Sequence, residues 1–271
     1  MVFHRTQVLQ SFSIITLKWL KKGYIVKKLV AYITASYPDA NFTIDLSAKL
    51  AEAGVDFLEL GIPFSDPVAD GPVIELANLN ALKGGFKIDD LFRISKEIAP
   101  LINTLWMGYF NPFYHKGLDT FINEAKQSGV IGFIIPDLPF EEAAAYKPQI
   151  EAANLNLIDF IAPTDTPKRI KQIVSDAKLF IYMVAYAGIT GSNKSEYLTP
   201  IIQSVKEATN TPLFIGFGVN EQNAKEKAKD VDGVIVGSTF IKVLLDENLN
   251  YSQKIDKIAT IAKSIKEQIN S

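Results

Sequence analysis

Eight short β-rich runs, separated by stretches with helical periodicity, place the strongest constraint on the fold of this chain. The runs are "LVAYITA", "FLELGI", "TLWMGYF", "VIGFIIP", "LIDFIAP", "LFIYMVAY", "PLFIGFGV" and "VDGVIVGS". Helical patterns such as residues 41–54 and 118–129 lie between them and end at glycines, which commonly follow helices. Strands that alternate with helices, with few hairpin signals, predict parallel βα units. Eight units in 271 residues predict a single (β/α)8 TIM barrel domain over residues 1–271.

An open, doubly wound sheet is the main alternative fold. Such a sheet is expected to carry a glycine-rich fingerprint after its first strand, and residues 33–41, "ITASYPDAN", contain no glycine. Before the first strand, Val8, Phe12, Ile15 and Trp19 recur at helical spacing. We therefore expect residues 1–28 to form a helical segment that packs on the barrel, and a further helix at the C-terminus.

Composition excludes several classes of function. The formal net charge is −2, so no basic field is available to hold nucleic acid or an anionic membrane. The chain has no cysteine and two histidines, which argues against thiolate or multi-histidine metal sites, and we expect no metal. No apolar run approaches the length that spans a bilayer. The absence of cysteine suits a reducing compartment, and we expect a cytoplasmic protein that acts on a small molecule.

A carboxylate stands inside the second β-rich run, within "LELGIPFSDPVADGP" at residues 58–72. Side chains alternate along a strand, so Glu59 should point toward the barrel interior, where desolvation raises a carboxyl pKa. The following loop is stiffened by prolines and presents Asp70 at the active end of the barrel. Two carboxyl groups in unlike environments can divide acid and base roles. A structural ion pair for Glu59 and ordinary turn chemistry for Asp66 and Asp70 explain the residues equally well.

The same stretch resembles the signature of the α subunits of tryptophan synthase. The resemblance extends over residues 29–245 and includes "MGYFNP", "PDLPFEE", "GITG", "GFGV" and "GVIVGS". It implies a (β/α)8 barrel that acts as a carbon–carbon lyase and cleaves indole-3-glycerol phosphate to indole and glyceraldehyde 3-phosphate. It also implies a β subunit as partner in an α2β2 complex that makes tryptophan. Pyridoxal phosphate is then expected only in that partner, and no cofactor in this chain.

The resemblance assigns roles to individual residues. Glu59 would protonate the indole ring and take the side-chain hydroxyl proton, while Asp70 would act at the ring nitrogen. Glycine-bearing stretches after the sixth, seventh and eighth runs suit a phosphate nest of backbone N–H groups. By resemblance, the substrate phosphate is bound by the following residues: Gly191, Phe217, Gly218, Gly237 and Ser238. A tight βα turn is the simpler explanation for any one of these glycines alone.

An indole pocket and a lid complete the expected site. Leu29 matches a position that relatives fill with phenylalanine, and Met107 and Tyr109 follow a strand end, although all three suit an apolar core equally well. Residues 186–197 suit a mobile lid, in which Thr190 would position Asp70 by resemblance. Tyr182 matches a family tyrosine close to the catalytic glutamate, and a buried core tyrosine explains it equally well. Tyr186 occupies a position where many relatives carry arginine. His115 is expected to be an ordinary loop residue. Phe140 is expected in a loop that docks the partner.

Three alternative functions share some of these features. A different phosphosugar barrel enzyme would share the phosphate nest but lack the motif around Glu59 and Asp70. A stand-alone lyase would release free indole without a partner. A non-catalytic activator of a β subunit would be marked by loss of either carboxylate, and both are present.

Overall fold

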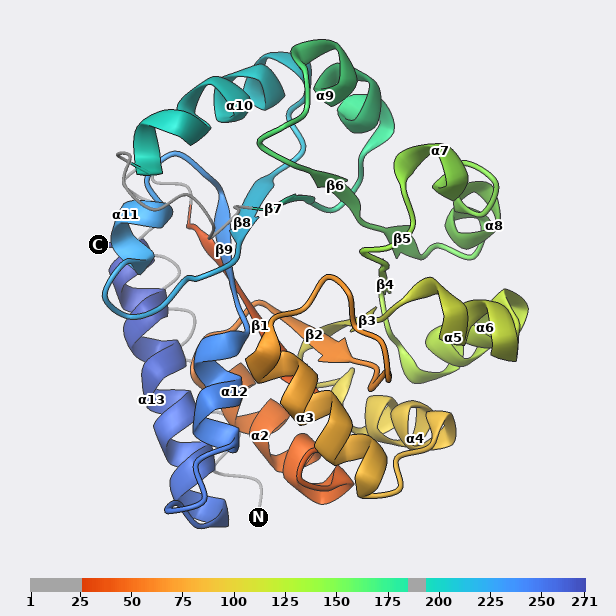
Figure 1. Ribbon diagram of the computed structural model, residues 1–271, viewed down its shortest axis with the longest axis vertical. Helices are drawn as coiled ribbons and strands as arrows, with labels where there is room; N and C mark the ends of the chain where they lie inside the picture. Colours follow the sequence, from red (N-terminus) through yellow and green to blue (C-terminus); the bar gives the residue numbers. More distant parts are fainter. Residues whose placement is uncertain (1–25, 185–193) are drawn as a thin grey trace, which may run out of the picture.

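The computed structural model describes residues 26–184 and 194–271, and within them nine parallel strands form one sheet that curls into a barrel (Figure 1). The strands are β1 (Lys28–Thr34), β2 (Phe57–Gly61), β3 (Asn103–Met107), β4 (Gly132–Ile134), β5 (Asn156–Leu157), β6 (Asp159–Ile161), β7 (Ile181–Val184), β8 (Leu213–Gly216) and β9 (Gly233–Val236). Their order in the sheet is β5-β4-β3-β2-β1-β9-β8-β7-β6. All eight β-rich runs form strands, and the predicted barrel is confirmed.

The fifth run differs from the prediction because it forms two short strands instead of one. β5 pairs with β4, whereas β6 pairs with β7, and only Ile158 separates the two segments. The Ile158 N–H still donates to the Phe133 carbonyl of β4 over 3.0 Å, and pairing with β7 begins at the next residue, Asp159. The two ends of the sheet therefore meet within one run of the chain, and the barrel closes there.

Helices surround the barrel on its outer side (Figure 1). Those of the described residues are α2 (Ala40–Glu52), α3 (Pro72–Lys83), α4 (Ile88–Ile98), α5 (Phe110–Lys116), α6 (Leu118–Ser128), α7 (Phe140–Ala143), α8 (Lys147–Ala152), α9 (Pro167–Ile173), α10 (Lys194–Ala208), α11 (Ala224–Lys227), α12 (Ser238–Leu244) and α13 (Tyr251–Ile269), with a 3₁₀ turn at Val174–Asp176. Among them, none is long and apolar enough to cross a membrane. A helical segment is expected over residues 1–28, and residues 1–25 of it lie outside the described part of the chain.

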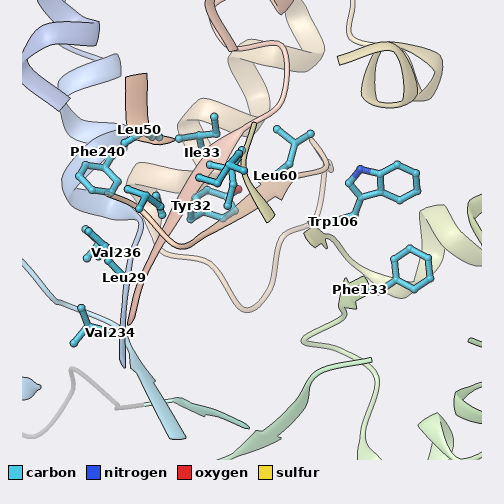
Figure 2. Close-up of a cluster of buried hydrophobic side chains, with 14 of the residues drawn as sticks. Leu29, Tyr32, Ile33, Leu50, Leu60, Trp106, Phe133, Val234, Val236 and Phe240 are labelled. Atoms are coloured by element: carbon cyan, nitrogen blue, oxygen red, sulfur yellow. The ribbon is translucent and has the colours of Figure 1, made fainter. Parts of the chain in front are cut away.

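Alternation along the strands produces two apolar cores. The outward face of β2 places Leu58 and Leu60 in a large cluster between the barrel and its helices. Figure 2 shows part of this cluster, where Leu29 of β1 lies near Val236 of β9. Inward-facing side chains form a second cluster inside the barrel, to which Val30 of β1 belongs. The interior is thus filled at its base, and only its upper end is left for a site.

The C-terminal helix α13 is fastened to the base of the barrel by Asp56. This carboxylate accepts a hydrogen bond from the Leu29 N–H over 2.8 Å and pairs with Lys28 over 3.0 Å. Lys266 of α13 pairs with the same carboxylate and donates to the Lys27 carbonyl. The predicted C-terminal helix is confirmed, and its last turns are tied to β1 and β2.

Replacing Lys147 with methionine should strongly destabilise the fold. Its ammonium group lies 3.0 Å from Asp159 at the start of β6, and their side chains are only 8% and 5% exposed. Lys147→Met leaves that carboxylate buried without its main partner, which costs about 3–5 kcal/mol. Lys178→Met removes a surface pair with Glu151 and should cost about 1 kcal/mol or less. Urea unfolding measures both, and equal losses would contradict the importance of the buried pair.

Candidate active site

Glu59 projects into the barrel from the middle of β2 and is 1% exposed. Two residues earlier on the same face, the Phe57 ring centre lies 5.8 Å from that of Phe180 and 6.1 Å from that of Phe214. Phe180 and Phe214 stack on each other with ring centres 4.5 Å apart. These rings form an apolar floor beneath the carboxyl group, whose Oε1 has no hydrogen-bond partner among the described residues. Burial, reinforced by the charge of Asp70, raises the pKa of Glu59 to about 8. Glu59 therefore carries a proton at neutral pH.

Asp70 lies in the acidic loop, residues 62–71 between β2 and α3, and is only partly buried. The Tyr109 hydroxyl donates to its Oδ2 over 3.0 Å and accepts from the Ala69 N–H over 2.9 Å. The Tyr109 ring also stacks on Phe64 of the same loop, with centres 5.4 Å apart. Burial raises the pKa of Asp70 to about 6, although the Tyr109 hydrogen bond opposes the shift. Asp70 is therefore mostly ionised at neutral pH.

Glu59 and Asp70 line a single cavity of about 890 Å³ at the carboxyl ends of the strands. The volume lies within the range of small-molecule sites. Tyr182 of β7 also lines the cavity, is buried, and stacks on Phe160 with ring centres 4.9 Å apart. The cavity thus combines an apolar, aromatic wall with two carboxyl groups of unlike pKa, an arrangement that separates a proton donor from a proton acceptor.

The structure corrects the expectation for Leu29. This side chain lies on the outward face of β1 in the cluster of Figure 2 and is absent from the cavity wall. Tyr32, three residues later, faces inward, lines the cavity and is the register partner of Glu59. Tyr32 lies on the same face of β1 as Val30, which belongs to the interior cluster, as the alternation of side chains along a strand requires.

Two glycines make room for the tyrosine rings. A Cβ atom on Gly61 would lie 2.4 Å from the Tyr32 hydroxyl oxygen, because the ring crosses over β2 at that point. A Cβ atom on Gly216 would lie 2.5 Å from the Tyr182 hydroxyl oxygen. Neither glycine was expected to matter, since the distance between ring and backbone depends on pairing between strands.

The other expected pocket residues take different places. Met107, at the end of β3, and Phe217, after β8, both line the cavity. Tyr109 is absent from the cavity wall, and it instead fixes the acidic loop through the hydrogen bond to Asp70. His115 lies in α5, a helix, and not in a loop as expected.

The expected phosphate-binding residues that are described come together at one side of the cavity. Phe217 and Gly218 follow β8, while Gly237 and Ser238 follow β9, and all four line the cavity. The Thr239 hydroxyl donates to the Val219 carbonyl over 2.9 Å and joins the start of α12 to the turn after β8.

Part of the expected site belongs to residues that the structure does not describe. Thr190, Gly191 and Tyr186 lie outside the described residues, as does most of the expected lid. Within the described ranges, no three histidine, aspartate or glutamate side chains are grouped so that they could hold a metal ion.

Comparison with known proteins identifies the family. The family profile described as "Tryptophan synthase alpha chain" matches residues 21–270. A tryptophan synthase alpha chain from Wolinella succinogenes is 58% identical over 247 residues, which cover 91% of this chain and 97% of that protein. The chain belongs to the tryptophan synthase alpha chain family. Membership makes it a lyase of tryptophan biosynthesis.

Solved structures of tryptophan synthase share the barrel. The tryptophan synthase subunit alpha from Campylobacter jejuni is 33% identical, with a TM-score of 0.81 over 89% of this chain and 98% of that one. A chain of tryptophan synthase from Mycobacterium tuberculosis is 29% identical, with a TM-score of 0.80 over 90% of this chain and 93% of that one. The barrel therefore belongs to an architecture already seen in this family.

Proposed function

We propose that this chain cleaves indole-3-glycerol phosphate to indole and glyceraldehyde 3-phosphate, with Glu59 and Asp70 as the reacting carboxyl groups. The observation that carries the assignment is the pair itself. A protonated carboxyl group on an apolar floor and a mostly ionised carboxylate on a fixed loop line one cavity. A flat, apolar ring suits the aromatic wall, and the glycine loops suit a phosphate group.

The reaction requires proton transfers at three atoms. Glu59 donates its proton to indole C3 while Asp70 accepts the proton of the ring nitrogen, giving a neutral indolenine. The bond between C3 and the side chain then breaks, and its electron pair returns to the ring as the nitrogen regains its proton from Asp70. Glu59 takes the side-chain hydroxyl proton as the aldehyde forms. Both carboxyl groups end as they began, so the chemistry requires no cofactor in this chain.

The rate should depend on pH with two limbs. Cleavage needs Asp70 ionised and Glu59 protonated, so kcat/KM should rise as pH passes about 6 and fall as pH passes about 8. Both carboxyl pKa values are raised by burial, which places the optimum near neutral pH. Indole release, followed by absorbance across this range, measures the profile. A rate that keeps rising above about pH 9 would contradict Glu59 as the proton donor.

Similarity to chains of tryptophan synthase supports a β subunit as partner, and we infer an α2β2 complex in which pyridoxal phosphate belongs to the partner. The loops at the active end offer a surface for docking. Val68, in the acidic loop, is 82% exposed. Phe140, expected in a docking loop, is instead the first residue of helix α7 and is half-buried. Exposed apolar side chains beside a site commonly mark an interface.

Light scattering on the chain mixed with a tryptophan synthase β subunit tests the proposed complex. We expect a two-to-two assembly, and we expect Val68→Asp to weaken it because the variant adds a charge to the docking surface. Lys225→Met, on α11, is the matched surface control. If the chain stays monomeric with an excess of β subunit, the proposed complex is wrong.

A further inference from the structure

The turn after β8 has an uncommon backbone. Phe217 has φ of 76° and Gly218 has φ of 66°, so two consecutive residues are left-handed. Glycine adopts this conformation freely, whereas a phenylalanine rarely does and persists there only when its surroundings hold it. Both residues line the cavity at the proposed phosphate site. The turn must therefore be held by contacts from outside itself.

Three consecutive carbonyl groups of this turn are held by side chains. Lys227 Nζ donates to the Phe217 carbonyl over 2.7 Å, and Asn223 Nδ2 donates to the Gly218 carbonyl over 2.8 Å. The Thr239 hydroxyl donates to the Val219 carbonyl over 2.9 Å. Lys227 and Asn223 lie at opposite ends of α11, and together they hold the turn from the side of that helix.

Holding the carbonyls fixes the direction of the amides. In a planar trans peptide the N–H group points opposite to the preceding C=O. With the Phe217 and Gly218 carbonyls turned toward α11, the N–H groups of Gly218 and Val219 point away from that helix. Neither amide donates a hydrogen bond within the described part of the chain. Adjacent free amides in a turn of this kind bind anions.

We propose that Lys227 and Asn223 are positioning residues for the substrate phosphate, because they hold two adjacent amides in the orientation that receives it. The ammonium group of Lys227 also lies 3.8 Å from the point where a Cβ of Gly218 would be, so its positive charge stands next to the turn. The inference rests on the proposed function, since that function supplies the phosphate. Loss of either contact should therefore weaken the binding of phosphate-bearing ligands and leave the binding of indole unchanged.

Two variants test whether the side chains of Lys227 and Asn223 position the turn or only stabilise the fold. Lys227→Met removes the charged donor, and Asn223→Asp replaces the amide donor with an oxygen that faces the Gly218 carbonyl. Lys225→Met is the matched control, since this lysine is exposed on the same helix. The readouts are KM and kcat for indole-3-glycerol phosphate, calorimetric binding of glycerol 3-phosphate, binding of indole, and thermal unfolding.

Lys227→Met and Asn223→Asp should each raise KM and weaken glycerol 3-phosphate binding about tenfold, a typical effect of losing one hydrogen bond. The change in kcat should be smaller than that in KM, and indole binding should match the unchanged protein. Equal loss of indole and glycerol 3-phosphate binding, or phosphate binding as tight as in Lys225→Met, would overturn the inference. Absence of cleavage by the unchanged protein would instead refute the proposed function. Binding of glycerol 3-phosphate would still test whether Lys227 and Asn223 position the turn.

Discussion

Glu59→Gln should lower kcat for indole release by about 10²- to 10⁴-fold or more while substrate still binds. The amide has almost the same shape as the protonated carboxyl group that burial favours at neutral pH. It cannot give up a proton to indole C3, nor can it take the hydroxyl proton afterwards. Single-turnover measurement of indole release gives the rate, and calorimetry with indole-3-glycerol phosphate gives the affinity.

Glu52→Gln is a suitable control for this experiment, because its carboxylate is largely exposed and pairs with Lys49 across one turn of α2. That variant should keep the full rate. If Glu59→Gln cleaves substrate as fast as Glu52→Gln, the buried glutamate is not the acid. The cavity would then need another proton donor, and Tyr182 would be the first residue to examine.

Asp70→Asn should lower kcat by about 10²-fold or more, for a different reason. The amide still accepts a hydrogen bond from the Tyr109 hydroxyl, so the loop should keep its position. It has no negative charge with which to take the proton of the ring nitrogen. The protonated intermediate would then carry a full positive charge in an apolar cavity, which is costly. Single-turnover measurement of indole release, as for Glu59→Gln, gives the loss in kcat.

Asp66→Asn supplies the matched control, since Asp66 lies in the same loop but is exposed and contacts Ser65. The control should cleave substrate at an unchanged rate. Equal losses in the two variants would show that general acidity of the loop matters, rather than the placement of Asp70 in the cavity.

Much of the fold follows from patterns that are local in the sequence. Alternation in "FLELGI" correctly separates Leu58 and Leu60, which pack under the helices, from Phe57 and Glu59, which face the interior. The glycines after two expected helices also lie where a helix ends, with φ of 89° at Gly54 and 80° at Gly129. Such features depend on spacing along one segment, so the sequence alone is sufficient to predict them.

Features that depend on pairing between distant segments could not be predicted in the same way. The division of the fifth run at Ile158 arises because its two halves have different neighbours. The expectation for Leu29 is wrong for a different reason, because it follows the resemblance where strand alternation, a local pattern, assigns the pocket position to Tyr32. The hydrogen bond between Lys227 and the Phe217 carbonyl requires a turn and a helix end to meet, and no local pattern encodes it.

Indole release from indole-3-glycerol phosphate by the purified chain, alone and with a β subunit plus serine, tests the central claim most directly. We predict slow release of indole and glyceraldehyde 3-phosphate in equal amounts by the chain alone, and strong acceleration by the partner. Fast release without a partner would support a stand-alone lyase and contradict the coupled complex. No release under either condition would contradict the roles of Glu59 and Asp70 and favour a non-catalytic activator.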